Sequence, residues 1–276
     1  MTRVRAPGSS ANLGPGFDVL GLAVARYVWA WDEDGQRADD APSEPCGPDH
    51  IARIAYEAAG GTGPIWFDFE LEPSRGLGFS AAARAAGALL ASLQAGYGPA
   101  EAQDLAYRVV ADIEGHGDNA APAVYGGTYL IAGDLAHRIP GPFPGRLLFW
   151  VPEFETLTDD SRACLPDRID RADAVFNLGR VALLVAAVYE GRLDLLARAT
   201  EDRLHQPLRF EACDQSAKAY RGALEAGAAA AWLSGSGPTV AVVTDDARFE
   251  AVCGVLAGTG RVLALDMDLA GAVAVD

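Results

Sequence analysis

A glycine-rich turn that leads into a helix is the segment of this chain best suited to bind an anion. Gly76, Gly78 and Ser80 lie in the run Gly-Leu-Gly-Phe-Ser, and residues 80–95 are rich in alanine and leucine, as helices are. Glycines let a backbone approach a phosphate closely, and a helix N-terminus favours negative charge. The Ser80 hydroxyl could cap this helix or ligate a metal ion. A plain turn between a strand and a helix would have the same pattern, so this segment alone is a weak signal.

A second polar segment follows the apolar helix expected at residues 100–114. It carries Glu114, His116, Asp118 and Asn119, with two glycines between them. Glu114 could hold Mg²⁺, while His116 and Asn119 could donate to a small polar ligand. The alternative is an ordinary helix end, in which Gly115 terminates the helix and the histidine interacts with the helix dipole.

Two further segments are rich in glycine and serine, at residues 9–18 and 233–239. In the first, Asn12 and Asp18 could hold an ammonium or hydroxyl group, although Asx turns use the same residue types. The second, Leu-Ser-Gly-Ser-Gly-Pro-Thr, stands between apolar strands and is also typical of a simple connection. None of the four segments decides a function alone, but their occurrence in one chain is more specific.

Taken in order, the four segments resemble the signature motifs of the GHMP small-molecule kinases. The matching blocks read V-R-x-P-x-S-S-A-N-L-G-P-G-F-D, G-L-G-x-S-A-A, E-G-H-x-D-N-x-A-P-A and L-S-G-S-G-P-T, and the first and third look most like those of homoserine kinases. Residues 158–166 and 206–209 are similar to two further segments of that family, T-x-x-A-R-x-x-L-P and E-P-x-R. The similarity spans most of the chain.

The resemblance implies an α+β fold of two domains. Residues 1–143 would form an N-terminal, nucleotide-binding domain like ribosomal protein S5 domain 2, and residues 144–276 would form a ferredoxin-like C-terminal domain. The implied activity is ATP-dependent phosphorylation of the side-chain hydroxyl of homoserine or a similar small hydroxy amino acid, with ATP and Mg²⁺ as cofactors. Members of the family are often dimeric, so a homodimer is one expectation.

The same resemblance assigns roles to individual residues. It places the ATP phosphates on Gly76, Leu77, Gly78, Ser80 and Ala81, with Mg²⁺ on Ser80 and Glu114. It places the amino acid on Asn12, Asp18, His116, Asn119, Arg162 and Arg209. The two arginines suit bidentate capture of a carboxylate, and replacing either is expected to weaken substrate binding while leaving the fold intact.

The resemblance also implies how catalysis would work. Homoserine kinases are thought to lack the aspartate base of other GHMP kinases. Catalysis would then rest on positioning and on charge neutralisation of the phosphoryl group, which phosphoryl transfer permits. The residues that would carry it are Ser80, Glu114 and Asn119.

The nucleotide half of the implied site departs from the family pattern. The family motif reads P-x-x-x-G-L-G-S-S-A, but here the loop after Pro73 is one residue shorter and Phe79 replaces the first serine. The phenyl ring could occupy phosphate space or point into the core. Residues 35–50, expected near adenine, are also acidic. Two alternatives therefore stay open: a kinase of this fold with another donor or acceptor, and a non-catalytic protein that binds an amino acid.

Strands and helices must position these segments, and they interleave without a regular βαβ rhythm, which favours an α+β fold. Residues 2–6 are predicted to be extended and residues 7–16 to be a loop. Strands are predicted at residues 19–31, 65–71, 125–132, 146–151, 231–233, 240–244 and 261–267. Helices are predicted at residues 51–59, 80–95, 100–114, 174–190, 194–203 and 215–226, and from residue 247.

The composition excludes several kinds of partner. The 276 residues carry a net charge of −16, so the surface repels nucleic acid and anionic lipid. Lys218 is the only lysine, so positive charge at the phosphates must come from Arg75 or Arg84. No stretch of about 18 uncharged apolar residues is present, and the four cysteines are far apart. We therefore expect a cytoplasmic protein with reduced thiols.

Overall fold

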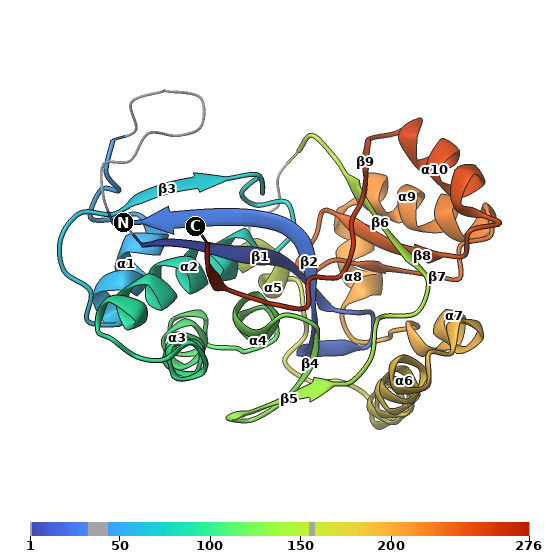
Figure 1. The fold of residues 1–276 in the computed structure, drawn as a ribbon. Helices are drawn as coiled ribbons and strands as arrows, with labels where there is room; N and C mark the ends of the chain where they lie inside the picture. The colour runs from blue at the N-terminus through green and yellow to red at the C-terminus, as the bar shows by residue number, and fades with distance from the viewer. Residues whose placement is uncertain (1, 33–43, 155–157, 276) are drawn as a thin grey trace.

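Two antiparallel sheets lie side by side, each covered by its own helices (Figure 1). The computed structural model describes residues 2–32, 44–154 and 158–275 of the chain. Strands and helices alternate irregularly along the chain, and every strand pair in the described residues is antiparallel. The prediction of an α+β fold is therefore confirmed.

The first sheet has the strand order β10-β1-β2-β4-β5, and β3 pairs with β2. Its strands are β1 (Arg3–Asn12), β2 (Gly16–Trp31), β3 (Trp66–Phe69), β4 (Thr128–Ala132), β5 (Leu135–Ile139) and β10 (Val273–Val275). Its helices are α1 (Ile51–Ala58), α2 (Phe79–Gln94), α3 (Pro99–Glu114) and α4 (Ala120–Tyr125). The alanine- and leucine-rich α2 packs on β1 and β2 and is buried along most of its length.

The prediction of a loop at residues 7–16 is wrong, because most of this segment belongs to β1. Pro7 and Gly8 look like turn residues, yet both pair with β2 across a register shift. Gly8 is needed there because a Cβ would collide with Leu71 and with the Leu77 carbonyl. Close packing, rather than a turn, thus explains this glycine, and the strand delivers the next residues directly to the site.

The second sheet has the order β7-β8-β6-β9. Its strands are β6 (Arg146–Val151), β7 (Ala230–Leu233), β8 (Val240–Thr244) and β9 (Arg261–Ala264), and α9 (Asp214–Glu225) and α10 (Phe249–Ala257) pack on it. The other elements are α5 (Thr158–Ala163), α6 (Arg171–Glu190), η1 (Leu193–Leu195), α7 (Leu196–Ala199) and α8 (Gln206–Ala212). Sequence reasoning missed α4, α5, α8, β5 and β10. Because β10 returns to pair with β1, the last strand joins the first sheet, and the domain boundary at residues 143/144 stays a prediction.

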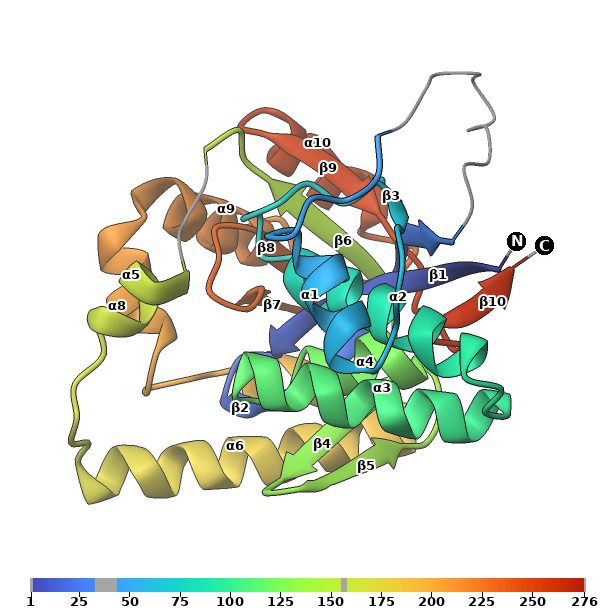
Figure 2. The same cartoon turned by 90° about the vertical axis from the view of Figure 1, so that its left-hand side faces the viewer.

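Helix α6 is long and runs beside β4 and β5 (Figure 2). By length and composition it is the one helix among the described residues that could cross a membrane. It contains Asp173 and Arg180, and its inner face, including Leu184 and Val188, is buried in the protein. Packing against the core therefore explains part of its apolar surface, and its outer face remains exposed.

Candidate active site

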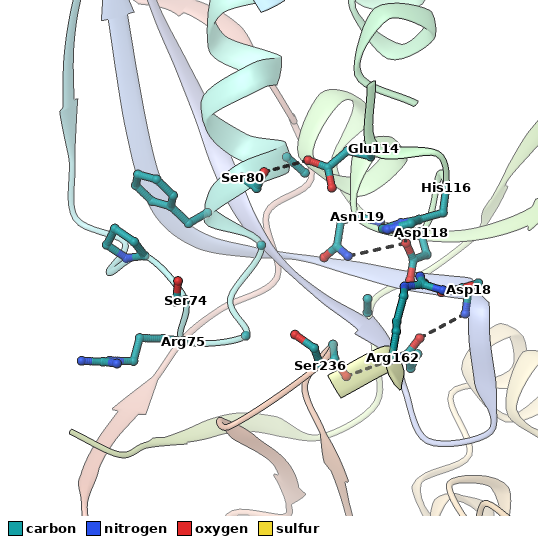
Figure 3. A pocket seen from close by; sticks show the side chains of 18 of the residues that line it. Asp18, Ser74, Arg75, Ser80, Glu114, His116, Asp118, Asn119, Arg162 and Ser236 are labelled. Carbon is teal, nitrogen blue, oxygen red and sulfur yellow. Dashed lines mark hydrogen bonds and ion pairs between the residues drawn. The ribbon is translucent and has the colours of Figure 1, made fainter. Parts of the chain in front are cut away.

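A cavity of about 340 Å³ opens where the two sheets meet. It is lined by the β1–β2 loop, the start of α2, the α3–α4 connection, α5, α8 and the β7–β8 turn (Figure 3). Every residue that the family resemblance assigned to the site lines this cavity except Leu77. The Leu77 side chain is buried, and its carbonyl accepts a hydrogen bond from the Ser9 N–H at 3.0 Å.

The glycine-rich turn ends at the cavity as the sequence predicted. Gly76 and Gly78 have φ values of +74° and +69°, a left-handed conformation that favours glycine, and Gly78 directly precedes α2. The Ser234 hydroxyl donates to the Gly76 carbonyl at 2.6 Å, so the β7–β8 turn braces the loop. Because Ser80 and Ala81 also line the cavity, the positive end of α2 points toward it.

Ser80 and Glu114 face each other across this end of the cavity (Figure 3). The Ser80 hydroxyl donates to Glu114 Oε1 at 2.9 Å. Arg84, one turn further along α2, contacts both of these oxygens through Nη1. The predicted metal ligands are therefore adjacent, and a guanidinium contacts both of them.

The structure shows where the Phe79 ring lies, which the sequence left open between the phosphate space and the core. Its ring packs edge-to-face against Phe67 and Phe69 of β3, with ring centroids 6.1 and 5.4 Å apart. It also lines the cavity. The phenyl group is thus held by β3 and forms a wall beside the phosphate loop. Of residues 35–50, the region expected near adenine, residues 35–43 lie outside the described residues.

The segment after α3 carries a histidine that is hydrogen-bonded to a carboxylate. His116 Nδ1 lies 2.7 Å from Asp118 Oδ1, and the same oxygen accepts the Asn119 backbone N–H. This hydrogen bond raises the pKa of His116 above its ordinary value of 6.5, although burial opposes the shift. The Asn119 side-chain oxygen accepts from the Ser9 hydroxyl at 2.8 Å, which fixes the amide beside the cavity.

Asp18 and Arg162 form a bidentate ion pair at the other end of the cavity. The two N–O distances are 2.9 and 2.7 Å, and the Arg162 side chain is 39% exposed. Asn12 shapes the loop before Asp18: its side-chain oxygen accepts the Asp18 N–H, and its amide donates to the Gly235 carbonyl at 2.9 Å. Arg162 also lies over the ring of Phe17.

Three polar side chains at this end could be mistaken for a metal site. Ligand atoms of Asp18, His116 and Asp118 lie within 4.8 Å of one another. Arg162 already holds Asp18 through both carboxylate oxygens, however, and His116 Nδ1 is hydrogen-bonded to Asp118, so these groups already have partners. The cluster is better suited to a charged organic ligand.

Arg209 is buried, which the sequence did not predict. It is 5% exposed and donates to the Ser161 and Gly235 carbonyls and to His205 Nδ1. His205 in turn donates from Nε2 to the Gly14 carbonyl at 2.7 Å. A guanidinium only donates and a carbonyl only accepts, so His205 is the neutral Nε2–H tautomer, and burial lowers its pKa accordingly.

This burial corrects one expectation for the two arginines. Replacing Arg209 would leave the buried His205 Nδ1 without its donor, at a cost of about 1–3 kcal/mol, and would remove one of the donors to each of the Ser161 and Gly235 carbonyls. Only Arg162, at 39% exposed, can be removed with little effect on the fold.

Comparisons with known proteins agree with this geometry. Residues 47–127 match the model of the GHMP kinases N terminal domain, and residues 184–260 match that of the GHMP kinases C terminal. A homoserine kinase of Moorella thermoacetica is 41% identical over 261 residues, covering 87% of this chain and 86% of that protein. One of Thermus thermophilus is 38% identical over 261 residues, with 88% and 87% covered. The chain belongs to the homoserine kinase family of GHMP kinases.

Solved structures of GHMP kinases share the fold of this homoserine kinase family member. The structure of the homoserine kinase from Cytophaga hutchinsonii matches with a TM-score of 0.83 at 25% identity, covering 99% of this chain and 97% of that one. The Methanococcus jannaschii mevalonate kinase matches with a TM-score of 0.67 at 14% identity, covering 96% of this chain and 98% of that one, and shares the fold alone. The two-domain GHMP fold implied by the sequence is confirmed.

Asp118, which lines the cavity, and His205, which lies behind it, were missing from the sequence prediction. Asp118 was noted in its motif but given no role, although it holds both His116 and Asn119. The role of His205 was not predicted, because no helix was expected at α8. Once that helix is known, the spacing of four residues between His205 and Arg209 shows that they are neighbours.

The raised pKa of His116 predicts a pH-dependent loss of stability for Asp118→Asn. A histidine with a raised pKa contributes stability that is fully present below its unfolded pKa of about 6.5 and is lost as pH rises through the folded pKa. Urea unfolding of the kinase should therefore show a larger difference from wild type at about pH 6 than at about pH 9. Asp112→Asn, an exposed change on α3, is the control. A difference independent of pH would contradict this assignment.

Proposed function

We propose that this member of the homoserine kinase family transfers the γ-phosphoryl group of ATP to the side-chain hydroxyl of L-homoserine. The observation that carries the proposal is the cavity of about 340 Å³, which joins an anion-binding helix start to a pair of opposite charges. One end suits the phosphates and the other suits a zwitterion. The names of the relatives over most of the chain support the same reaction.

The amino-acid end matches a free amino acid in charge and in geometry. Asp18 would accept the ammonium group, and Arg162 would bind the carboxylate through its two parallel N–H groups. In the free protein these two side chains bind each other. Substrate binding would therefore replace their ion pair with one contact from Asp18 to the ammonium group and one from Arg162 to the carboxylate. Arg209 would add positive charge while its buried hydrogen bonds hold it still.

The transfer step requires alignment of two oxygens about one phosphorus atom. The homoserine hydroxyl oxygen forms a bond to the γ-phosphorus while the bond to the β,γ-bridging oxygen breaks, and the hydroxyl proton is released. Asn119, held by Ser9, lines the cavity between the two ends and would orient the hydroxyl. His116 beside it would complete the amino-acid site. Such positioning is most of what phosphoryl transfer asks of a protein.

For the nucleotide, Gly76, Gly78, Ser80 and Ala81 are proposed to hold the phosphates, aided by the backbone of Leu77. The apolar side chains that line this end, Ile51, Pro73 and Phe79, offer a surface for the base. We propose Mg²⁺ as the ion that accompanies ATP as its complex, where it neutralises phosphate charge. Its contact with Ser80 and Glu114 stays a prediction, and it would require Arg84 to leave both oxygens.

The other interpretations of the sequence are not favoured. The shortened loop still lines the cavity with its glycines and Ser80, which supports the proposed phosphate site despite the altered motif. The four thiols are free, which suits the proposed cytoplasmic location. The charge of −16 likewise supports a protein with no nucleic-acid or membrane partner.

An assay of ADP release tests the proposed reaction. With MgATP, L-homoserine should be turned over far faster than L-threonine or L-serine. Turnover of none of the three, under conditions in which the protein is folded, would contradict the proposal.

Arg162→Ala should raise the KM for homoserine about tenfold to a hundredfold, because a charge-assisted contact to the carboxylate is lost. Its unfolding midpoint should stay close to that of wild type. Steady-state kinetics check the first claim and thermal unfolding the second. Arg192→Ala, an exposed arginine that pairs with Asp194, is the matched control and should change neither.

We also propose a homodimer formed through the outer face of α6. Val175, Leu178 and Tyr189 are 61%, 70% and 67% exposed, and their spacings of about three and eleven residues return to one face of a helix. Light scattering should give twice the chain mass for wild type and the chain mass for Leu178→Glu. Val255→Glu, on exposed α10 surface, should stay dimeric, and a wild-type monomer would contradict the proposal.

A further inference from the structure

The side chain of Arg84 lies where the sequence predicts a metal ion. Arg84 stands one turn after Ser80 on α2, and its Nη1 contacts both the Ser80 hydroxyl and Glu114 Oε1. Oxygen donors of this kind suit Mg²⁺. A guanidinium, however, is a cation without a lone pair and cannot share that position with a metal ion. In this arrangement the two donors do not fit a divalent ion.

Burial makes this ion pair matter for an anionic ligand. The side chains of Arg84 and Glu114 are 19% and 12% exposed, so solvent screens their charges poorly. Glu114 lines the cavity, whereas Arg84 is not among the lining residues. Without a counter-ion, the Glu114 carboxylate would repel phosphate oxygens held by the start of α2.

Another donor of Arg84, its Nε–H group, bears on what fixes the position of the side chain. Within the described part of the chain, Arg84 Nε is buried and has no hydrogen-bond partner. A buried donor without a partner costs free energy. The contacts with Ser80 and Glu114 must offset that cost, so the guanidinium lies where it does because of these two oxygens.

We propose that Arg84 is the resident counter-ion of Glu114 and lets a nucleotide polyphosphate bind without a metal ion between Ser80 and Glu114. The inference rests on the proposed function, since it concerns the nucleotide of the same site. Arg84 acts through Glu114 and is therefore a positioning residue. Its effect must disappear when Glu114 carries no charge.

Calorimetric titration with ADP in EDTA tests this role apart from catalysis. Arg84→Gln should weaken metal-free ADP binding about tenfold, because an uncompensated carboxylate then faces the phosphates. Saturating Mg²⁺ should remove most of the difference, since the ion can now occupy the vacated position. Arg108→Gln, an exposed arginine on α3, is the matched control and should bind ADP as wild type does.

The double variant Arg84→Gln/Glu114→Gln separates charge from structure. It should recover metal-free ADP binding to within about threefold of wild type, because the repelling carboxylate is gone. It also keeps the test valid if Arg84→Gln alone folds poorly, since no unpaired charge is left at the site. Thermal unfolding of each variant verifies the fold.

Three outcomes would overturn the assignment. The first is Arg84→Gln binding ADP as wild type does in EDTA, the second is an equal loss of ADP affinity with and without Mg²⁺, and the third is a double variant as weak as the single one. In each of these cases wild type still binds ADP, so the proposed function stands. If wild type binds ADP under neither condition, the nucleotide part of the proposed function fails and the Arg84 assignment fails with it.

Discussion

The hydrogen bonds between β1 and the β7–β8 turn are the constraint on which the site depends. Trp232 Nε1 donates to the Ser10 hydroxyl at 3.0 Å, the Ser10 and Ser234 hydroxyl oxygens lie 2.8 Å apart, and Ser234 reaches the Gly76 carbonyl. Trp232, Ser10 and Ser234 have no exposed surface, so each lost bond would leave a buried polar group unpaired. The next residue, Gly235, accepts from both Asn12 and Arg209. One turn therefore fixes the phosphate loop and the amino-acid loop relative to each other.

Within this frame, three pairs of side chains at or beside the cavity each join a carboxylate to a basic group. Arg162 binds Asp18, Arg84 binds Glu114, and His116 binds Asp118. A chain with a net charge of −16 can thus present a site for a polyphosphate, because the local balance and the start of α2 matter more than the total charge. At the amino-acid end, ligand binding would break the Asp18–Arg162 pair and give each of the two side chains a partner on the ligand. His205, which is buried nearby, stays neutral because burial lowers its pKa more than the neighbouring Asp202 carboxylate raises it.

Motifs located nearly all of the site because their residues come from short, ordered segments. The strand at Pro7 and Gly8 was not predictable from the sequence. Gly8 is required because its backbone packs closely against Leu71, and that contact exists only in the folded protein. The burial of Arg209 and its bond to His205 depend on a helix too short to show a clear period. Arg84 was named only as a source of positive charge, since its contact with Glu114 joins two helices. The position of the Phe79 ring was not predictable from the motif either, because the ring packs against β3, which lies outside the motif.

The exchange of partners at the amino-acid end is the central claim, and a crystal structure with L-homoserine bound tests it most directly. We expect the substrate carboxylate on Arg162 and the ammonium on Asp18, with the direct contacts between these two side chains, 2.7 and 2.9 Å in the free protein, broken. Arg209, His205 and the Gly14 carbonyl should not move. Homoserine bound elsewhere in the cavity, or bound with the Asp18–Arg162 pair intact, would contradict the exchange.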